Sequence, residues 1–580
     1  MARPDNRMPH GSRFLNRLYA WRARRRPAAT GFVSQPEPRT IGSYARGRQL
    51  VAGNLLFAGY LVESTDTGLW EVAAPDAAFD AERHGFAWLD DLAAVGDPAA
   101  RAKAQKWVWG WIGQHGRGPG PGWLPDLTGR RLIRWINHAL FLLGGTEKPE
   151  SDTFFRSLAQ QAWFLSRRWQ GAAPGLPRFE ALAGLVYAGL SLEGCEDLAD
   201  PAIKALAAEC TSQIGSEGGL PTRNPEELLD VFMLLTWVCA ALHEAGRSLP
   251  KAQASAIARI APTLRTLRHS DGGLARFHGG GRGLEGRLDH ALAASHVAER
   301  QADGLAMGFA RLSARRTSVI VDAAPPPAGA ASGNGHASTL AFELTSGRRP
   351  LVVNCGSGAA FGVEWRRAGR STPSHSTLCL EGQSSARLAP PARGTGFEAL
   401  VDPPQNVPLE LSDSHEGLRL EAAHDGYAAQ FGLTHARKLD LSFDGRKLAA
   451  EDMLVALDGA ARQRFARVRG ANPEGGPAFD IRLHLHPEVD AALDLGGAAV
   501  SMALKSGEIW VFRHDGSCDM RLEPGVYLEQ TRLKPRAAKQ IVLSGRAIGY
   551  ATRVRWTLSK TQETAIAVRD LNRDDPETYD

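Results

Sequence analysis

The feature that most constrains this chain is a change of sequence texture between residues 310 and 320. Before it, from about residue 45, apolar residues recur at intervals of three and four, and Gly, Pro or Asp separates the segments. After it, short runs rich in β-branched residues alternate with Pro, Gly and Ser turns, as in "TSVIVDAAPPPAGAASGNG". The sequence therefore predicts a helical domain followed by an antiparallel β-sandwich.

The length of 580 residues supports two large domains, because a single hydrophobic core usually stops growing below this size. We place the helical domain at residues 45–312 and the sandwich at residues 313–565. Successive helices with short connections predict helical hairpins packed on one another. A basic, flexible segment at 1–44 and a polar tail at 566–580 complete the predicted organisation.

The net charge of +5 comes from the N-terminal segment. Its arginines are Arg3, Arg7, Arg13, Arg17, Arg22, Arg24, Arg25 and Arg26, and without them the rest of the chain is close to neutral. Nucleic-acid binding is not expected, since a basic footprint should lie on a folded domain. The stretch "RFLNRLYAWRARRR" is either a solvated tail or an amphipathic helix that touches a membrane surface or a partner.

Features that the sequence lacks also bear on the class of protein and on its location in the cell. The N-terminal segment lacks the apolar region of a cleaved signal peptide, and no uncharged apolar run is long enough to span a bilayer, so we expect no integral membrane segment. The cysteines are scattered without CxxC spacing, which indicates buried free thiols rather than a disulfide or zinc framework. They are Cys195, Cys210, Cys239, Cys355, Cys379 and Cys518.

Three segments are richer in polar residues and glycine than packing requires. In "EGGLPTRNPEELL", Asn224 and Pro225 form a standard helix start, and Arg223 beside Asn224 also makes a corner suited to a carboxylate. In "LRHSDGGLARFHGGGRG", the residues His269, Asp271, Arg276 and His278 line either a cleft or a surface turn.

The third segment is the strand region that carries His336, Asn354 and His375, the last in "GRSTPSHSTLCLEG". A single histidine on a strand is more often a satisfied packing group than a ligand, unless several converge. His435 lies on a further strand, and His484 and His486 share one face of another, where cross-strand packing is the preferred interpretation. The chain contains no Walker A, GxSxG or HExxH motif.

Taken together, these residues resemble the heparinase II/III-like polysaccharide lyase family. The resemblance runs from about "GRQLVAGNLLFAG" to "VRWTLS", and its most specific parts are "DLTGRRLIRWINHALFL", "GGLPTRNPEELL", "LRHSDGGLARFHGG", "GHASTLAFELTSGRRPLVVNCG" and "RSTPSHSTL". It implies an N-terminal incomplete α/α toroid followed by a C-terminal antiparallel β-sandwich. It also implies a carbon-oxygen lyase that cleaves an acidic, uronate-containing polysaccharide, such as a glycosaminoglycan, by β-elimination.

In such a lyase one group neutralises the uronate carboxylate, a Tyr or His removes the C5 proton, and another group protonates the departing O4. Carried onto this chain, Asn224 and Arg223 hold the carboxylate and a histidine, His278 or His375, is the base. Where many family members have Tyr-His after the loop, this chain has Glu226 and Glu227. We assign substrate binding to Arg276, His269, Arg370 and His435.

The family also carries a metal in its sandwich, and the matching positions here are His336, Ser338, Asn354 and His375. Both acidic ligands of the family pattern are replaced, by Ser338 and Asn354. A zinc ion needs three or four donors that neutralise part of its charge. We therefore expect no metal and no other cofactor, and instead a hydrogen-bonded polar cluster that faces the toroid.

Two other functions stay open. A non-catalytic glycan-binding or envelope-assembly protein on the same scaffold would explain the lost ligands. A hydrolase would use paired carboxylates, for which Glu217, Glu226 and Asp271 lie in suitable loops. The family resemblance implies the cell envelope or periplasm, whereas the missing signal peptide and unpaired cysteines favour the cytoplasm.

Overall fold

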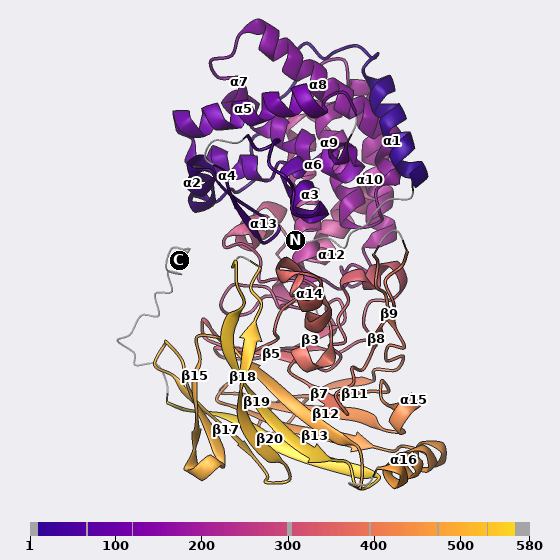
Figure 1. Ribbon diagram of the computed structural model, residues 1–580, viewed down its shortest axis with the longest axis vertical. Helices are drawn as coiled ribbons and strands as arrows, with labels where there is room; N and C mark the ends of the chain where they lie inside the picture. The colour runs from indigo at the N-terminus through magenta and orange to yellow at the C-terminus, as the bar shows by residue number, and fades with distance from the viewer. Residues whose placement is uncertain are drawn as a thin grey trace.

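The computed structural model describes residues 10–64, 68–118, 120–298, 304–393, 396–472, 475–530 and 532–562. A helical domain occupies one half of the molecule and two packed sheets the other half (Figure 1). The predicted tail at 566–580 lies outside the described residues, as do the first nine residues of the chain. No helix in the described ranges has the length and apolarity that a membrane span needs.

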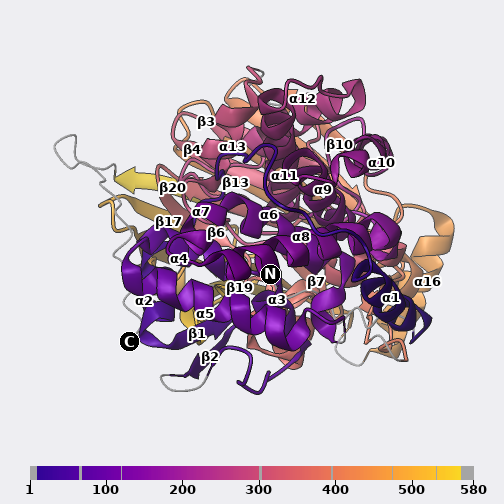
Figure 2. The same ribbon diagram turned by 90° about the horizontal axis from the view of Figure 1, so that it is seen from above.

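The helical domain is an arc of antiparallel helices, an incomplete toroid (Figure 2). Its helices are α1 (His10–Ala23), α2 (Tyr44–Ala52), α3 (Ala77–Gly85), α4 (Trp88–Val95), α5 (Pro98–His115), α6 (Pro125–Asn137), α7 (Ala139–Leu143), α8 (Lys148–Arg168), α9 (Leu176–Ser191), α10 (Ala199–Gln213), α11 (Pro225–Glu244), α12 (Lys251–Thr266) and α13 (Arg287–Ser295). A short hairpin of β1 (Asn54–Phe57) and β2 (Tyr60–Glu63) follows α2.

Close backbone contact holds α6 against α9, and two glycines make it possible. A Cβ on Gly129 would lie 2.1 Å from the carbonyl oxygen of Glu180, and a Cβ on Gly184 would lie 2.4 Å from the Cα of Gly129. Both distances are far shorter than van der Waals contact, so neither position has room for a side chain. Tyr187, on the same helix α9, is fully buried and belongs to the core of the toroid.

The predicted flexible segment at 1–44 needs correction over the residues that the structure describes. Helix α1 packs on α8, where Ala20 is fully buried and Arg168 donates from Nε to Oδ1 of Asn16 at 2.7 Å. Asn16, Ala20 and Ala23 recur at intervals of four and three, so they form one buried stripe among the arginines. The sequence does not reveal this stripe, because it consists of a few small or polar residues within a segment dominated by arginine.

The sandwich consists of two antiparallel sheets. The sheet that faces the toroid has the order β18 (Asp519–Tyr527), β19 (Arg536–Arg546), β14 (Ala478–Leu485), β6 (Arg349–Val353), β5 (Phe342–Ser346), β4 (Thr317–Asp322) and β3 (Phe309–Ala314), and β7 (Leu378–Leu380) also pairs with β14. The outer sheet has the order β10 (Leu409–Asp413), β11 (Gly417–His424), β12 (Thr434–Ser442), β13 (Lys447–Val455), β20 (Ala551–Gln562), β17 (Ile509–His514), β16 (Ala499–Ala503) and β15 (Asp490–Asp494).

Smaller elements complete the sandwich half. They are α14 (Val363–Gly369), α15 (Ala428–Phe431), α16 (Gly459–Ala471) and the pair β8 (Arg387–Leu388) and β9 (Leu400–Val401). Strand β3 begins at Phe309, a few residues before the predicted boundary at 312.

Each half of the molecule has its own apolar core, and the two cores meet. Phe309, Ile320 and Ala341 belong to the sandwich in sequence, yet they pack within the hydrophobic core of the toroid. The sandwich core lies between the two sheets and includes Trp510 and Trp556. Because the toroid core continues into the first sandwich strands, the two halves are held in contact by apolar burial. All six cysteines are free, as predicted, but only Cys195, Cys210, Cys355 and Cys379 are buried, whereas Cys239 and Cys518 are partly exposed.

Candidate functional site

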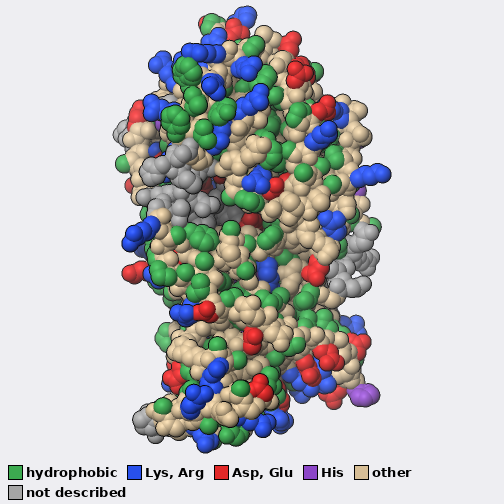
Figure 3. Space-filling view, turned by 90° about the vertical axis from the view of Figure 1, so that its right-hand side faces the viewer, with side chains coloured by type: hydrophobic (Ala, Val, Ile, Leu, Met, Phe, Trp, Pro, Cys, Tyr) green, Lys and Arg blue, Asp and Glu red, His purple; other side chains and the backbone are tan. Residues whose placement is uncertain are grey.

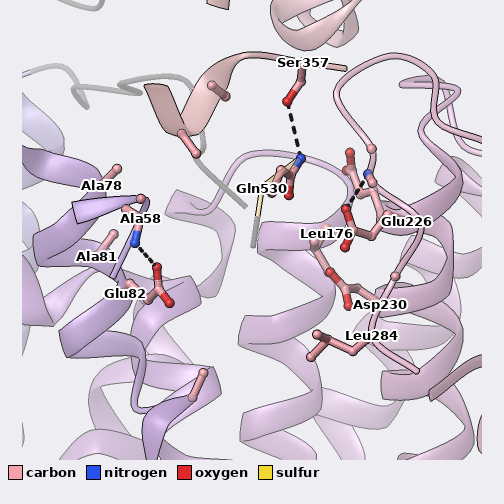
Figure 4. A pocket seen from close by; sticks show the side chains of 18 of the residues that line it. Ala58, Ala78, Ala81, Glu82, Leu176, Glu226, Asp230, Leu284, Ser357 and Gln530 are labelled. Atoms are coloured by element: carbon pink, nitrogen blue, oxygen red, sulfur yellow. Dashed lines mark hydrogen bonds between the residues drawn. The ribbon is translucent and has the colours of Figure 1, made fainter. Parts of the chain in front are cut away.

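A large cleft of about 2040 Å³ lies between the toroid and the sandwich. Its lining comes from α1, α2, α3, α4, α6, α9 and α11 of the toroid, from the glycine loop at 271–287, and from the sandwich. Figure 4 shows Glu226 and Asp230 of α11 on one side and Gln530 of the sandwich near them. The space-filling view in Figure 3 shows the surface hollowed between the two halves. The volume exceeds that of a typical small-molecule site, so the cleft suits an extended ligand.

The two walls of the cleft differ in charge. The toroid wall carries most of the carboxylates, namely Asp80, Glu82, Asp90, Asp91, Asp126, Glu226, Glu227 and Asp230, beside Arg13, Arg17, Arg46, Arg130 and Arg287. The sandwich wall and the adjoining glycine loop carry Arg276, Arg282, Arg348, Arg349, Lys505, Arg532 and Arg536, beside Asp271, Glu285, Glu488 and Glu529. An anionic ligand is therefore favoured on the sandwich wall.

Strand order explains why cations gather on that wall. In the antiparallel order β18, β19, β14, β6, the end of one strand lies near the start of the next, and Tyr527 pairs directly with Arg536. His486 follows the end of β14, and Arg349 begins β6. Residues far apart in the sequence therefore meet at the toroid-facing end of one sheet.

Tyr527 is the central group of this wall. Its ring lies 5.2 Å from the ring of His486 and 5.8 Å from the Arg276 guanidinium carbon. Burial raises the pKa of Tyr527 to about 12, and the Arg276 charge opposes that rise. Burial, followed by the positive charge of Arg276 and Arg536, holds the pKa of His486 well below its usual value. Both rings are therefore uncharged near neutral pH, beside fixed cations.

The glycine loop places Arg276 beside Tyr527. Glu343 of β5 accepts from the backbone N–H of Arg276 at 3.1 Å, and its other oxygen lies 3.7 Å from the Arg276 side chain. Glu343 also lies 3.2 Å from Nε2 of His269, whose Nδ1 lies 2.9 Å from the Ser318 hydroxyl. Arg276 lines the cleft, as the sequence predicts, whereas His269 is buried and joins the loop to the sandwich. Its predicted role in substrate binding is corrected accordingly.

The Arg223 side chain also forms its contacts within the protein. Its guanidinium donates to Asp322 Oδ1 at 2.5 Å and to the carbonyl oxygens of Met307, Gly308, Ala324 and Pro325. It also lies 4.6 Å from the ring centre of Phe309. The group predicted to hold a substrate carboxylate therefore holds a buried protein carboxylate and bridges the two domains.

Asn224 is the N-cap of α11, and its Oδ1 accepts from the backbone N–H groups of Glu226 and Glu227. Pro225 is the first residue of that helix, so the predicted helix start is confirmed. A Cβ on Gly280 would lie 2.4 Å from this same Oδ1, so the glycine loop packs tightly over the cap. Of the carboxylates considered for a hydrolase, Glu226 and Asp271 line the cleft, whereas Glu217 is exposed elsewhere.

The two predicted bases, His278 and His375, belong to a buried cluster behind the cleft. His278 is fully buried, its Nδ1 accepts from the backbone N–H of His336 at 3.1 Å, and its Nε2 lies 3.4 Å from Asp322 Oδ2. Burial lowers the pKa of His278, and Asp322 opposes that effect. His375 is 1% exposed, and neither ring is among the residues that line the cleft. Their predicted role as the base therefore lacks access to a substrate in the cleft.

Hydrogen bonds fix the proton positions along the cluster. Nδ1 of His375 lies 2.8 Å from the Ser371 carbonyl oxygen, which only accepts, so His375 carries its proton there. Its Nε2 is then an acceptor for Nδ1–H of His336 at 3.0 Å. Nε2 of His336 is left as a buried lone pair without a hydrogen-bond partner among the described residues. The three rings are neutral, because burial lowers the pKa of each.

The family's metal donors do not fit a divalent ion in this chain. Ser338 donates to Asp322 Oδ2 at 2.7 Å, Oδ1 of Asn354 accepts from the Ser376 N–H at 3.0 Å, and the rings of His336 and His375 bond to each other. In the part of the chain that the structure describes, no three His, Cys, Asp or Glu side chains form a group suited to a metal. The polar cluster that the sequence predicts is present, and the expectation of no cofactor stays a prediction.

Arg370 and His435 lie away from the cleft wall. Arg370 is 1% exposed and donates to the carbonyl oxygens of Ser332, Gly335 and Glu398. His435 is fully buried in the sandwich, where its Nε2 lies 2.8 Å from Asp452 and its Nδ1 lies 3.2 Å from His424. Both were predicted to bind substrate. The structure corrects this, because their polar atoms form hydrogen bonds with groups inside the protein.

The residues that best form the site were not singled out in the sequence. Tyr527 lies in a strand of ordinary pattern, "GVYLEQ", and His486 was assigned to cross-strand packing. The available signal was the proline that follows His486, because "HLHPEV" ends a strand and leaves its last histidine at the sheet edge. His484, two residues earlier, is buried against the Pro373 carbonyl, as packing predicts.

Comparisons with known proteins agree with this architecture. Residues 297–557 match the model of the C-terminal domain of heparinase II/III-like proteins. Over 551 residues the chain is 31% identical to FtsZ-localized protein C of Caulobacter vibrioides, and the match covers 92% of this chain and 91% of that protein. The chain belongs to the heparinase II/III-like family. The solved structures described next have low sequence identity to this chain, so the comparison with them shows the fold alone.

Heparinase III superposes with a TM-score of 0.65 at 13% identity, over 94% of this chain and 89% of that one. A mutant of the heparan sulfate lyase HepC from Pedobacter heparinus superposes with a TM-score of 0.58 at 14% identity, over 96% of this chain and 89% of that one. The toroid and sandwich predicted from the sequence are therefore confirmed. The chain has the fold of a polysaccharide lyase.

Proposed function

We propose that this protein is a lyase that cleaves a uronate-containing polysaccharide by β-elimination on the sandwich wall of the cleft. The observation that carries the proposal is Tyr527, an uncharged phenol among Arg276, Arg282 and Arg536. Arginine side chains bind and neutralise a carboxylate, which makes the neighbouring C5 proton more acidic. The cleft volume and its cationic wall accommodate an anionic chain.

Tyr527 serves as the proton carrier in this proposal. As phenolate it takes the C5 proton, the C4–O4 bond breaks as the C4=C5 double bond forms, and the phenol returns the proton to the departing O4. His486 stands beside it as a neutral donor, since its Nδ1 accepts from the Glu488 N–H at 3.3 Å and its Nε2 therefore carries the proton. No water is consumed, and the product is an unsaturated uronate.

The test is a panel of uronate polysaccharides followed by the ultraviolet absorbance of the unsaturated product. Tyr527→Phe keeps the ring and removes the proton carrier, so we expect a loss of about 100-fold or more in kcat/KM. The rate should increase with pH above neutrality, because the pKa of Tyr527, about 12, leaves little phenolate at pH 7. Tyr550→Phe is the matched control, since Tyr550 is exposed in the sandwich and does not line the cleft. Full activity of folded Tyr527→Phe would contradict the assignment.

A non-catalytic glycan-binding role is the second candidate. It is favoured by Arg223, Asn224, His278 and His375, each of which bonds to groups inside the protein. It is also supported by the relative named FtsZ-localized protein C, whose name describes a location and no reaction. Saturable binding of an acidic glycan, without any absorbance rise across the panel, would favour this candidate over the lyase.

A further inference from the structure

Helix α1 presents an outward surface that neither the core nor the cleft explains. Phe14 is 68% exposed and Trp21 is 43% exposed, one helical repeat of seven residues apart. Seven residues are close to two turns, so both rings lie on the same face, opposite the buried stripe of Asn16, Ala20 and Ala23. The exposed face is therefore an aromatic ridge on a helix that is already fixed to the protein.

Cations flank this ridge, and no acid interrupts it. Arg22, Arg24 and Arg25 are exposed beside the rings, and residues 10–36 contain neither Asp nor Glu. The guanidinium carbon of Arg25 lies 3.9 Å from the ring centre of Trp21. In Figure 3, Lys and Arg side chains gather together with hydrophobic ones on the upper part of the face that α1 occupies. Aromatic and basic residues in this arrangement are typical of helices that lie in a membrane interface.

The shape of the surface favours a membrane over a protein partner. Helix α1 lies at the outer edge of the toroid in both ribbon views, as a convex ridge packed on α8 (Figures 1 and 2). Protein partners usually bury an anchor residue in a pocket, whereas a lipid surface accepts protruding side chains. Anionic lipid headgroups also match the arginines in charge.

We propose that α1 is a peripheral docking helix that binds an anionic membrane surface, with Phe14 and Trp21 inserted between headgroups and the arginines bound to them. The helix does not have to fold on the membrane, because α8 holds it through Asn16, Ala20 and Arg168. Docking thus costs little ordering entropy. This inference goes beyond the proposed function and does not depend on it.

The experiment is co-sedimentation of the full chain with phosphatidylcholine vesicles, with and without phosphatidylglycerol. We expect binding only to the anionic vesicles, and weaker binding as salt increases. Phe14→Ser with Trp21→Ser, and separately Arg24→Gln with Arg25→Gln, should each reduce partitioning by about tenfold. Arg13 and Arg17 stay unchanged because they also line the cleft.

Two matched variants serve as controls. Leu140→Ser removes a side chain that is 78% exposed on α7, and it should leave binding unchanged. Arg24→Lys with Arg25→Lys keeps the charge and should retain binding. An unchanged melting temperature of each variant shows that the fold is intact. Equal binding to both vesicle types, no binding to either, or loss in the Leu140 variant alone would overturn the proposal, as would binding to a soluble acidic protein or glycan with no binding to vesicles.

Discussion

Replacing Asp322 with Asn is expected to lower the free energy of unfolding by about 3–5 kcal/mol, because it leaves a buried arginine without its counter-ion. Asp322 is fully buried, accepts from Arg223 at 2.5 Å and from Ser338 at 2.7 Å, and lies 3.4 Å from His278. The Arg223 charge is the main influence that holds the pKa of Asp322 far below its usual value despite burial. These contacts join the toroid loop to the first strands of the sandwich.

Urea unfolding followed by circular dichroism measures this effect. The control is Asp402→Asn, since Asp402 pairs with Arg387 on the exposed surface and should cost less than about 1 kcal/mol. A double variant, Arg223→Met with Asp322→Leu, removes both charges and should recover most of the loss. If Asp322→Asn lowers the free energy of unfolding as little as the surface control does, the ion pair with Asp322 does not stabilise Arg223 in the folded protein.

The fold follows from local pattern, which is why the sequence predicts it well. Helical periodicity ends and strand alternation begins within a few residues of Phe309, where β3 starts. Asn224 followed by Pro225 marks the beginning of α11, because helix capping depends only on residues that are neighbours in the sequence. Helix α1 is the exception, since its buried stripe of Asn16, Ala20 and Ala23 depends on the presence of α8.

The site depends on contacts between distant residues, and the sequence predicts much less of it. Arg223 is matched by Asp322, which lies 99 positions later in the chain. Tyr527 meets His486 only because β19 and β14 follow β18 in the sheet order. His278 and His375 both contact His336, a convergence that their spacing in the sequence leaves open, and neither lines the cleft. Whether such a residue lines the cleft depends on how the two domains pack around it, and this has no local signature in the sequence.

The same buried histidines should make the protein sensitive to mild acid. Burial lowers the pKa of His375 to about 4 and of His484 to about 3, although each ring bonds a carbonyl oxygen that opposes this effect. In the unfolded chain a histidine has a pKa of about 6.5. Below that pH the unfolded state therefore binds more protons than the folded state, and the free energy of unfolding decreases.

The sign of the effect separates histidines from carboxylates. The contribution of His375 and His484 is fully present above pH 6.5 and is lost as the pH falls toward the folded values of about 4 and 3. The pKa values of Asp322 and Asp452 are lowered on folding, so their contribution persists down to about pH 4 and is lost only below it. The decline between pH 6.5 and 4 is thus assigned to the histidines.

For a single ring whose pKa is about 4 when folded and about 6.5 when unfolded, the loss at pH 4 amounts to about 3 kcal/mol. His375→Gln keeps one donor for Ser371 and one acceptor for His336 but cannot titrate, so its stability should fall less over this range, by about 2–3 kcal/mol. His415→Gln, on the exposed surface, is the matched control and should follow the wild type. Urea unfolding at pH 7, 5.5 and 4 measures the difference. A parallel decline in His375→Gln and wild type would show that this ring is not the one whose protonation drives acid unfolding.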